Sequence, residues 1–250
     1  MVQLRENERI DEVNDKLRLI QKTSGLTFGT DALLLAGYMD CRAERGLELG
    51  SGTGIISMLL LTRGKLAYAT ALEVQPTYAE LTARNAELNG LSDTLAATEA
   101  DVREYRTDVP FGVVYTNPPY MKATSGKACR EQERGIARHE IAGDISDFVA
   151  AAARSLKYGG AFYAVYRPDR LADLIAAMRE HRIEPKRLTL VHATAQKAPS
   201  MLLIEGRAGG RGGMRVTPPL IIYREDARTY SEDMDHIMEH GSFPDKFRGK

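Results

Sequence analysis

Short apolar runs alternate with longer segments of helical periodicity through the middle of the chain. The apolar runs predict strands at residues 46–50, 67–74, 95–101, 111–117 and 161–166. Between them, apolar positions recur three or four residues apart, which predicts helices at 55–64, 76–90, 144–160 and 168–181. Strands separated by crossover helices form parallel sheets with both faces covered, so the pattern predicts an α/β fold.

Both ends of the chain depart from this alternation. A short strand is predicted at 16–21 and a helix at 30–39, where Thr30 or Asp31 is suited to cap the first N–H groups. Three strand-like runs follow residue 183, at 184–193, 200–206 and 214–223. We expect the last two, joined by a loop rich in glycine and arginine, to form an antiparallel hairpin at the sheet edge.

We expect a single domain over residues 1–250. An N-terminal extension covers 1–45, the core covers 46–223, and a polar tail with a helix opened by Ser231 covers 224–250. The core is expected to hold a central, mostly parallel, seven-stranded sheet with helices on both faces and the antiparallel hairpin at its C-terminal end.

Composition indicates a folded, water-soluble protein, with 43% hydrophobic and 27% charged residues. No run of about 18 apolar residues is present, so no membrane span is predicted. The charged N-terminus does not resemble a secretory signal. Cys41 and Cys129 fit no zinc spacing and indicate reduced thiols in the cytoplasm.

The formal net charge is +0, which argues against a generic polyanion binder, but the charge is uneven. Lys and Arg outnumber acidic residues over 186–215, which permits a local nucleic-acid surface or, equally, scattered solvated charge. His236 and His240 are four residues apart on a polar segment, where a solvated face is expected rather than a metal site.

The segment LELGSGTGI, residues 47–55, joins the first core strand to its helix. Its glycines allow a tight turn and a close approach of a ligand to the backbone. The spacing differs from the G-x-G-x-x-G of dinucleotide-binding proteins, because residue 55 is Ile and the third glycine comes one position early. Glu48 precedes the loop, and Glu73 ends the second core strand, where an acidic side chain can hold a ribose.

The pattern Glu-x-Gly-x-Gly-x-Gly, with an acid at the end of the second strand, resembles the class I S-adenosylmethionine (SAM) methyltransferases, whose fold is Rossmann-like. The resemblance implies that Glu73 holds the ribose of SAM and that Asp101, with Val102, lies beside its adenine. It also implies that the loop binds the amino-acid end of SAM through Glu48, Gly50, Ser51, Gly52, Thr53 and Gly54.

The segment NPPY, residues 117–120, follows the fourth core strand and raises a separate question of chemistry. Proline cannot continue a central strand, so Asn117 and Tyr120 are displayed at the carboxyl end of the sheet, where α/β proteins bind ligands. Asn117 Oδ1 and the Pro118 carbonyl can accept both N–H bonds of a planar amino group and orient its weakly nucleophilic nitrogen. Tyr120 can stack on the substrate ring.

NPPY resembles the motif of methyltransferases that act on planar amino nitrogens. The resemblance implies catalytic roles for Asn117, Pro118, Pro119 and Tyr120, and a place for Asn117 beside the cofactor. A nucleobase substrate has to be flipped out of its stack to reach such a site.

The whole chain resembles the bacterial tRNA adenine-N6 methyltransferases that modify the adenine beside the anticodon (position 37) of valine tRNA. The resemblance begins at ERIDEV, LRLIQ and FGTDALLLAGYM, continues through LELGSGTGIISMLL, EVQPTYAELTARNAELNGL and TNPPY, and ends at APSMLLIEGRAGGRGGMRVTPPLIIY. It implies SAM as cofactor, the anticodon arm of tRNA as partner, and a SAM-pocket wall formed by Phe28, Gly29, Thr30 and Asp31.

Basic residues near these motifs are candidate RNA contacts. We expect Lys122, in a loop over the target base, and Arg207, Arg211 and Arg215, with their neighbouring glycines, to contact phosphates of the anticodon arm. A flexible hairpin tip is the competing interpretation of the three arginines. The chain is expected to act as a monomer or a homodimer.

Other functions stay open at this point. The same motif serves guanine or adenine in ribosomal RNA, adenine in DNA, and the glutamine amide of release factors. The added domains of those enzymes are not recognisable here, since only 45 residues precede Gly46. A non-catalytic adaptor with a SAM-binding fold is a further alternative, but it would have no need of the complete NPPY.

Overall fold

The computed structural model describes residues 3–24, 28–119 and 143–248. The strands are β1 (Glu8–Asn14), β2 (Leu17–Lys22), β3 (Ala43–Leu49), β4 (Leu66–Glu73), β5 (Leu95–Glu99), β6 (Phe111–Thr116), β7 (Leu156–Tyr166), β8 (Ile183–His192), β9 (Pro199–Ala208), β10 (Arg215–Val216) and β11 (Leu220–Ile221). The helices are α1 (Thr30–Tyr38), α2 (Ile55–Thr62), α3 (Pro76–Leu88), α5 (Ile145–Ser155), α6 (Leu171–Glu180) and α7 (Glu232–His240), with 3₁₀ turns at Pro168–Arg170 and Asp245–Phe247.

The central sheet has nine strands among the described residues, in the order β10-β8-β9-β7-β6-β3-β4-β5, with β11 also paired to β8. Strands β3 to β7 are parallel to one another, and β9 runs antiparallel to both β7 and β8. The predicted mostly parallel α/β sheet with antiparallel strands near the C-terminus is therefore confirmed. The prediction of seven strands is two short, because β10 and β11, of two residues each, join the longer strands β3 to β9.

The pairing predicted for the C-terminal runs is wrong in detail. The 200–206 run does not pair with 214–223; it lies in β9, which forms the antiparallel pair with β8. The 214–223 run instead contributes β10 and β11, both parallel to β8. Two prolines, Pro218 and Pro219, fall between these short strands and lack the N–H that a continuous strand would need, so the run is divided.

The helix predicted over 144–160 ends earlier than expected. Asp144 caps it, with reciprocal hydrogen bonds between the side chains and backbone N–H groups of Asp144 and Asp147, but the helix stops at Ser155. Leu156 is extended and already pairs with Phe111 in β6, and the β6–β7 register shifts just beyond that pair. Gly159, with a φ of 74°, thus serves an irregular strand start and not the end of a helix.

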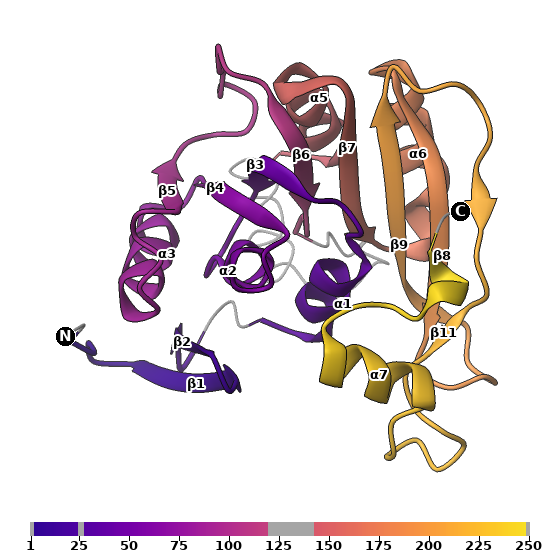
Figure 1. The fold of residues 1–250 in the computed structure, drawn as a ribbon, viewed down its shortest axis with the longest axis horizontal. Coiled ribbons are helices and arrows are strands. Elements are labelled where there is room, and N and C mark those ends of the chain that lie inside the picture. Colours follow the sequence, from indigo (N-terminus) through magenta and orange to yellow (C-terminus); the bar gives the residue numbers. More distant parts are fainter. Residues whose placement is uncertain (1–2, 25–27, 120–142, 249–250) are drawn as a thin grey trace, which may run out of the picture.

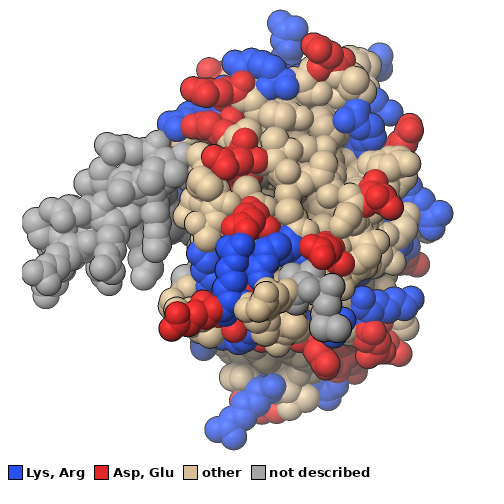
Figure 2. Space-filling model, turned by 90° about the vertical axis from the view of Figure 1, so that its left-hand side faces the viewer, with Lys and Arg blue, Asp and Glu red and all other residues tan. Residues whose placement is uncertain are grey.

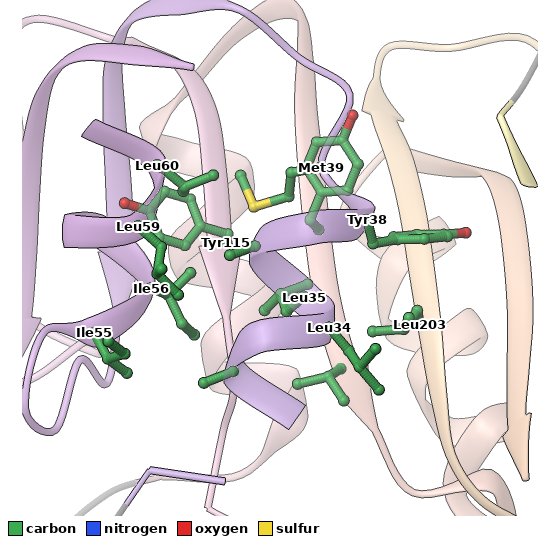
Figure 3. Packing of buried hydrophobic residues seen from close by; sticks show 14 of the residues in the cluster. Leu34, Leu35, Tyr38, Met39, Ile55, Ile56, Leu59, Leu60, Tyr115 and Leu203 are labelled. Atoms are coloured by element: carbon green, nitrogen blue, oxygen red, sulfur yellow. The ribbon is translucent and has the colours of Figure 1, made fainter. Parts of the chain in front are cut away.

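Two layers of apolar side chains enclose the sheet, with α1, α2 and α7 on one face and α5 and α6 on the other (Figure 1). Figure 3 shows the first layer, in which Leu34 and Leu35 of α1 pack beside Ile56 and Leu59 of α2, with Tyr115 of β6 between the two helices. Side chains alternate between the faces of β3, so Leu47 and Leu49 join the α5 side while Glu48 faces α2.

The N-terminal extension begins with a β1–β2 hairpin that packs beside α3. The strand predicted at 16–21 is confirmed as β2, whereas β1 was not predicted. Its sequence ERIDEVN has few apolar residues because its side chains are exposed or only partly buried in the hairpin. Across the described ranges 3–24, 28–119 and 143–248, no helix is long and apolar enough to span a membrane.

Candidate functional site

The sequence-predicted motifs meet where the strand order of the sheet reverses. The chain moves outward from β3 to β4 and β5 in one direction, and from β6 to β7 in the other. Leu49 pairs with Thr116 and also with Leu72, and Thr116 Oγ1 donates to the Leu49 carbonyl at 2.8 Å. The residues that follow these three therefore lie side by side, at the edge where open α/β sheets bind ligands. We call it the carboxyl edge, and the opposite one the amino edge.

Three glycines of the loop have left-handed backbone conformations, and the space around each of them differs. Gly50, Gly52 and Gly54 have φ values of 70°, 56° and 79°. A Cβ at Gly54 would lie 2.7 Å from Thr82 Cγ2 in α3, and one at Gly50 would lie 3.2 Å from Phe148 in α5. A Cβ at Gly52 would have no atom within 4 Å, so this glycine faces open space. The loop is thus closed on two sides and open on the third.

Glu73 is buried beside this loop, and both of its carboxylate oxygens are engaged. Oε2 accepts the Gly52 N–H at 2.9 Å, and Oε1 accepts the Gln75 N–H at 3.0 Å. Because a carboxylate oxygen can accept two hydrogen bonds, each retains one free acceptor position. Two neighbouring acceptors suit the two hydroxyls of a ribose.

Glu48 is buried and faces α2. Its Oε2 accepts the Ser57 N–H at 3.1 Å and the Ser57 hydroxyl, and that hydroxyl lies 2.7 Å from the Tyr115 hydroxyl. Burial raises the pKa of Glu48 to about 8, although the Ser57 bonds oppose the shift. The structure thus places Glu48 where it holds the first turn of α2.

Asp101 and Val102 lie beyond β5, on the same side of the sheet as Glu73. The Asp101 carboxylate accepts the Arg103 N–H at 2.8 Å and pairs with the Arg103 guanidinium, which lowers the pKa of Asp101. Val102 is buried, and its carbonyl accepts from the Arg154 guanidinium. Asp101 therefore has a local partner as well as the position that the motif predicts.

Asn117 follows the last residue of β6 at the carboxyl edge. Its Nδ2 donates to Asp31 Oδ2 at 2.8 Å. Its Oδ1 is buried and has no hydrogen-bond partner among the described residues. A buried amide oxygen without a donor is costly, typically by about 1–3 kcal/mol, and such an atom calls for an explanation. Ser51 Oγ, in the glycine loop, is likewise buried without a partner in this part of the chain.

The segment 28–31 reaches this site from the N-terminal extension. Phe28 N–H donates to Gln21 Oε1 at 2.9 Å, which ties the segment to β2. The predicted capping of α1 by Thr30 or Asp31 is wrong, because Gly29 is the N-cap and makes no side-chain cap. The Asp31 carboxylate is turned instead to Asn117 and to the Ala32 N–H.

The three arginines proposed for RNA contact lie away from Asn117. Arg207 pairs with Ala161, which itself pairs with Val113 near the start of β6, so Arg207 lies toward the amino edge. Its guanidinium is 2.9 Å from Glu205. Arg215 donates to two carbonyls of the C-terminal segment, at Lys246 and Arg248. Arg211 is exposed on the connecting loop. The arginines stay candidates for RNA binding at a distance from the target site.

Charge on the side of the molecule seen in Figure 2 is mixed, with Lys and Arg interspersed among Asp and Glu. Several of the basic residues of the chain are paired: Arg5 with Glu80, Arg84 with Glu8, and Arg187 with Asp40 and Glu205. Arg187 is also buried. Of the six basic residues in 186–215, Arg187 and Arg207 both pair with Glu205.

Of the remaining predicted site residues, Pro118 is buried and Pro119 is exposed, while Thr53 is buried in the loop. Tyr120 and Lys122 lie outside the described residues. Sequence reasoning missed Asn85, whose side chain accepts from Ile20 N at 2.7 Å and donates to the carbonyls of Ile20 and Thr53 at 3.1 Å each. A polar residue on the apolar face of the predicted helix was the feature of the sequence that could have indicated a buried role for Asn85.

Comparison with known proteins identifies relatives across most of the chain. The family model described as the methyltransferase small domain matches residues 23–181. The chain is 28% identical over 197 residues to a protein named tRNA1(Val) (adenine(37)-N6)-methyltransferase in Porphyromonas gingivalis, covering 75% of this chain and 76% of that one. It is 29% identical over 214 residues to a protein of the same name in Dyadobacter fermentans, covering 84% and 88%.

Solved structures confirm the Rossmann-like methyltransferase fold. A predicted O-methyltransferase from Agrobacterium tumefaciens matches with a TM-score of 0.69 and 25% identity, covering 86% of this chain and 98% of that one. A tRNA m1G37 methyltransferase from M. jannaschii matches with a TM-score of 0.56 and 17% identity, over 82% and 58%. A geranyl diphosphate C-methyltransferase in complex with S-adenosyl-L-homocysteine matches with a TM-score of 0.53 and 12% identity, over 72% and 75%.

Proposed function

We propose a function from one premise, which is that the chain belongs to the methyltransferase small domain family. The protein transfers a methyl group from SAM to the exocyclic N6 of adenine in tRNA, at position 37 beside the anticodon of valine tRNA. The names of the relatives support the substrate. The buried, unpartnered Oδ1 of Asn117 is the observation that carries the chemistry, because it is the acceptor that an amino group needs.

The residues at the carboxyl edge fit SAM. Gly52 leaves open space beside the loop, and Ser51 Oγ is a buried hydroxyl without a partner in the described chain, suited to the polar amino-acid end. Glu73 retains two acceptor positions for the ribose hydroxyls. When bound, SAM supplies a methyl group activated by a sulfonium centre. By the family resemblance, Asp101 and Val102 are assigned to the adenine of the cofactor, and Phe28, Gly29 and Thr30 to the wall of its pocket.

Catalysis by this chain is a matter of orientation. The lone pair of an aromatic amino nitrogen is delocalised into the ring, so the nitrogen is a poor nucleophile. Asn117 Oδ1 and the Pro118 carbonyl accept its two N–H bonds, hold it in one orientation and favour the positive charge that develops on it. Tyr120 stacks on the flipped adenine.

A hydroxyl acceptor fits this site less well, although one similar solved structure is titled a predicted O-methyltransferase. A hydroxyl has one proton, and it becomes a good nucleophile when a base removes that proton. The Asn117 amide is a neutral acceptor that cannot take up a proton in the physiological range. The two neutral acceptors, Asn117 Oδ1 and the Pro118 carbonyl, match an amino nitrogen with two N–H bonds.

The test is methyl transfer from labelled SAM to unmodified total tRNA, followed by mass spectrometry of the nucleosides. Parallel reactions contain ribosomal RNA, DNA and a release factor. N6-methyladenosine in tRNA alone is the expected result, and Asn117→Ala should lower kcat by about 10²–10³-fold, as when one positioned polar group is removed elsewhere.

Asn89→Ala is the matched control, since Asn89 lies at the C-terminal end of α3, where it pairs with the backbone of Arg18, and its loss should leave the rate unchanged. Label in ribosomal RNA or in the release factor would overturn the tRNA substrate while retaining the amino-nitrogen chemistry. SAM binding without transfer to any of the substrates would favour a non-catalytic adaptor.

A further inference from the structure

The orientation of the Asn117 amide is set by Asp31. A carboxylate oxygen accepts hydrogen bonds and does not donate them, so the group that faces Asp31 Oδ2 at 2.8 Å has to be the Asn117 NH₂. The amide oxygen must then point the other way, where it is buried without a partner in the described chain. One contact therefore decides which end of the amide is offered to a substrate.

Asp31 is itself held in place. Its Oδ1 accepts the Ala32 N–H at 3.0 Å, at the first turn of α1, where the unsatisfied N–H groups favour a negative charge. A Cβ at Gly29 would lie 2.8 Å from this same oxygen, so a larger residue at position 29 would displace the carboxylate. The Asp31 side chain is thus held by the Ala32 N–H, and it has room because Gly29 has no Cβ.

We propose that Asp31 is a positioning residue for methyl transfer, acting through Asn117. This inference rests on the proposed function. The terminal torsion of an asparagine has two broad, nearly equivalent orientations, and the Asp31 carboxylate selects the one with Oδ1 toward the substrate. In the other orientation the NH₂ would face the N–H groups of the target amine and repel them. An N-terminal residue, 86 positions from Asn117, thereby completes the NPPY motif.

The kinetic test separates this role from SAM binding, which the family resemblance implies for Asp31. Asp31→Ala should lower kcat by about tenfold or more, with the Kd of SAM measured by calorimetry changed less than twofold. Asp31→Asn should keep part of the rate, because its amide oxygen can still accept from Asn117. Adding Asp31→Ala to Asn117→Ala should cause no further loss. Asp233→Asn, which removes the ion pair between Asp233 of helix α7 and Lys246, is the matched control and should leave kcat unchanged.

A second measurement needs no substrate. The side-chain amide of Asn117 is assigned in ¹⁵N NMR spectra by its disappearance in Asn117→Ala. Loss of the charged acceptor in Asp31→Ala should shift its NH₂ signals upfield, and Asp233→Asn should not move them. Gly29→Ala, a milder change that displaces the carboxylate without removing it, should shift them in the same direction and also lower kcat.

Three results would overturn the proposal: amide signals unchanged in Asp31→Ala, a kcat within twofold of wild type, or a SAM affinity that falls as much as kcat. Failure of the proposed function is distinguishable, because wild-type enzyme would then leave tRNA unmethylated. The same variants are in that case compared on the substrate that the parallel reactions identify.

Discussion

Glu48 is the residue whose protonation state the fold changes most clearly near neutral pH. Its carboxyl is fully buried and has a pKa of about 8, against an ordinary value of 4.5. Between these two values the folded state binds more protons than the unfolded state. Raising the pH across this interval therefore favours unfolding, and the stability that the protonated carboxyl provides below about 4.5 is lost by about pH 8.

Replacement of Glu48 by Gln should remove this pH dependence, because Gln keeps an oxygen for the Ser57 bonds and does not titrate. Wild-type protein should lose up to about 1.4 kcal/mol of unfolding free energy per pH unit between pH 6 and 8 relative to Glu48→Gln. Urea unfolding at pH 6, 7, 8 and 9 measures the difference. Parallel curves for the two proteins would show that Glu48 does not titrate in this interval.

At the scale of single elements, the N-terminal hairpin is held to α3 by two asparagines one helical turn apart. Asn85 pairs with both backbone groups of Ile20, and Asn89 pairs with both of Arg18. The edge of β2 thus pairs with side chains of a helix in place of another strand. Asn85 also donates to the Thr53 carbonyl, so the hairpin, α3 and the glycine loop share one buried contact.

Asn85→Ala should cost more stability than Asn89→Ala. The first change leaves a buried N–H and carbonyl of Ile20 without partners, at about 1–3 kcal/mol each. The second exposes the Arg18 backbone to water, which can replace the bonds, and should cost below about 1 kcal/mol. Urea unfolding gives the two values, and hydrogen exchange of the Ile20 amide should accelerate in Asn85→Ala alone. Equal costs would contradict a buried role for Asn85.

The periodicity of apolar residues predicted strands that are buried along their length and helices with one buried face. It could not predict a side chain whose partner is far away in the sequence. The buried strands β3, β4 and β6 and the amphipathic helix α3 follow from local pattern, as do the glycines of the loop. β1 was missed because none of its side chains is buried, so its sequence lacks the alternation of apolar and polar residues that predicts a strand. Asp31 was expected to cap α1, since nothing in the sequence indicates that Asn117 lies beside it. Motif spacing predicted that the glycine loop, Glu73 and Asn117 follow strands that end at one edge of the sheet, but it could not predict a contact between residues 86 positions apart.

At the scale of the whole molecule, the two edges of the sheet differ in what RNA they can contact. The target adenine has to reach Asn117 at the carboxyl edge. Asn117 comes one residue after Thr116, which pairs with Ala164 of β7. Arg207 lies opposite Ala161, about 13 Å back along the strands, and Arg211 lies on the loop beyond it. The phosphates on either side of a flipped adenine are closer to the carboxyl edge, so these arginines can contact only more distant phosphates.

Replacing both Arg207 and Arg211 with Ala should therefore weaken the binding of full-length tRNA more than that of an isolated anticodon hairpin. The slope of log K against log salt should fall by at most about 2, because each lost phosphate contact contributes about 0.9, and SAM affinity should stay unchanged. Arg9→Ala is the matched control, since Arg9, like Arg207, pairs at 2.9 Å with a carboxylate two residues away on a strand. An equal loss for the hairpin would place the arginines near the target base, and an equal loss of SAM affinity would mean that the substitutions disturb the sheet. A loss confined to full-length tRNA would mean that the protein uses both edges of one sheet, the carboxyl edge for the base and the amino edge for the body of its substrate.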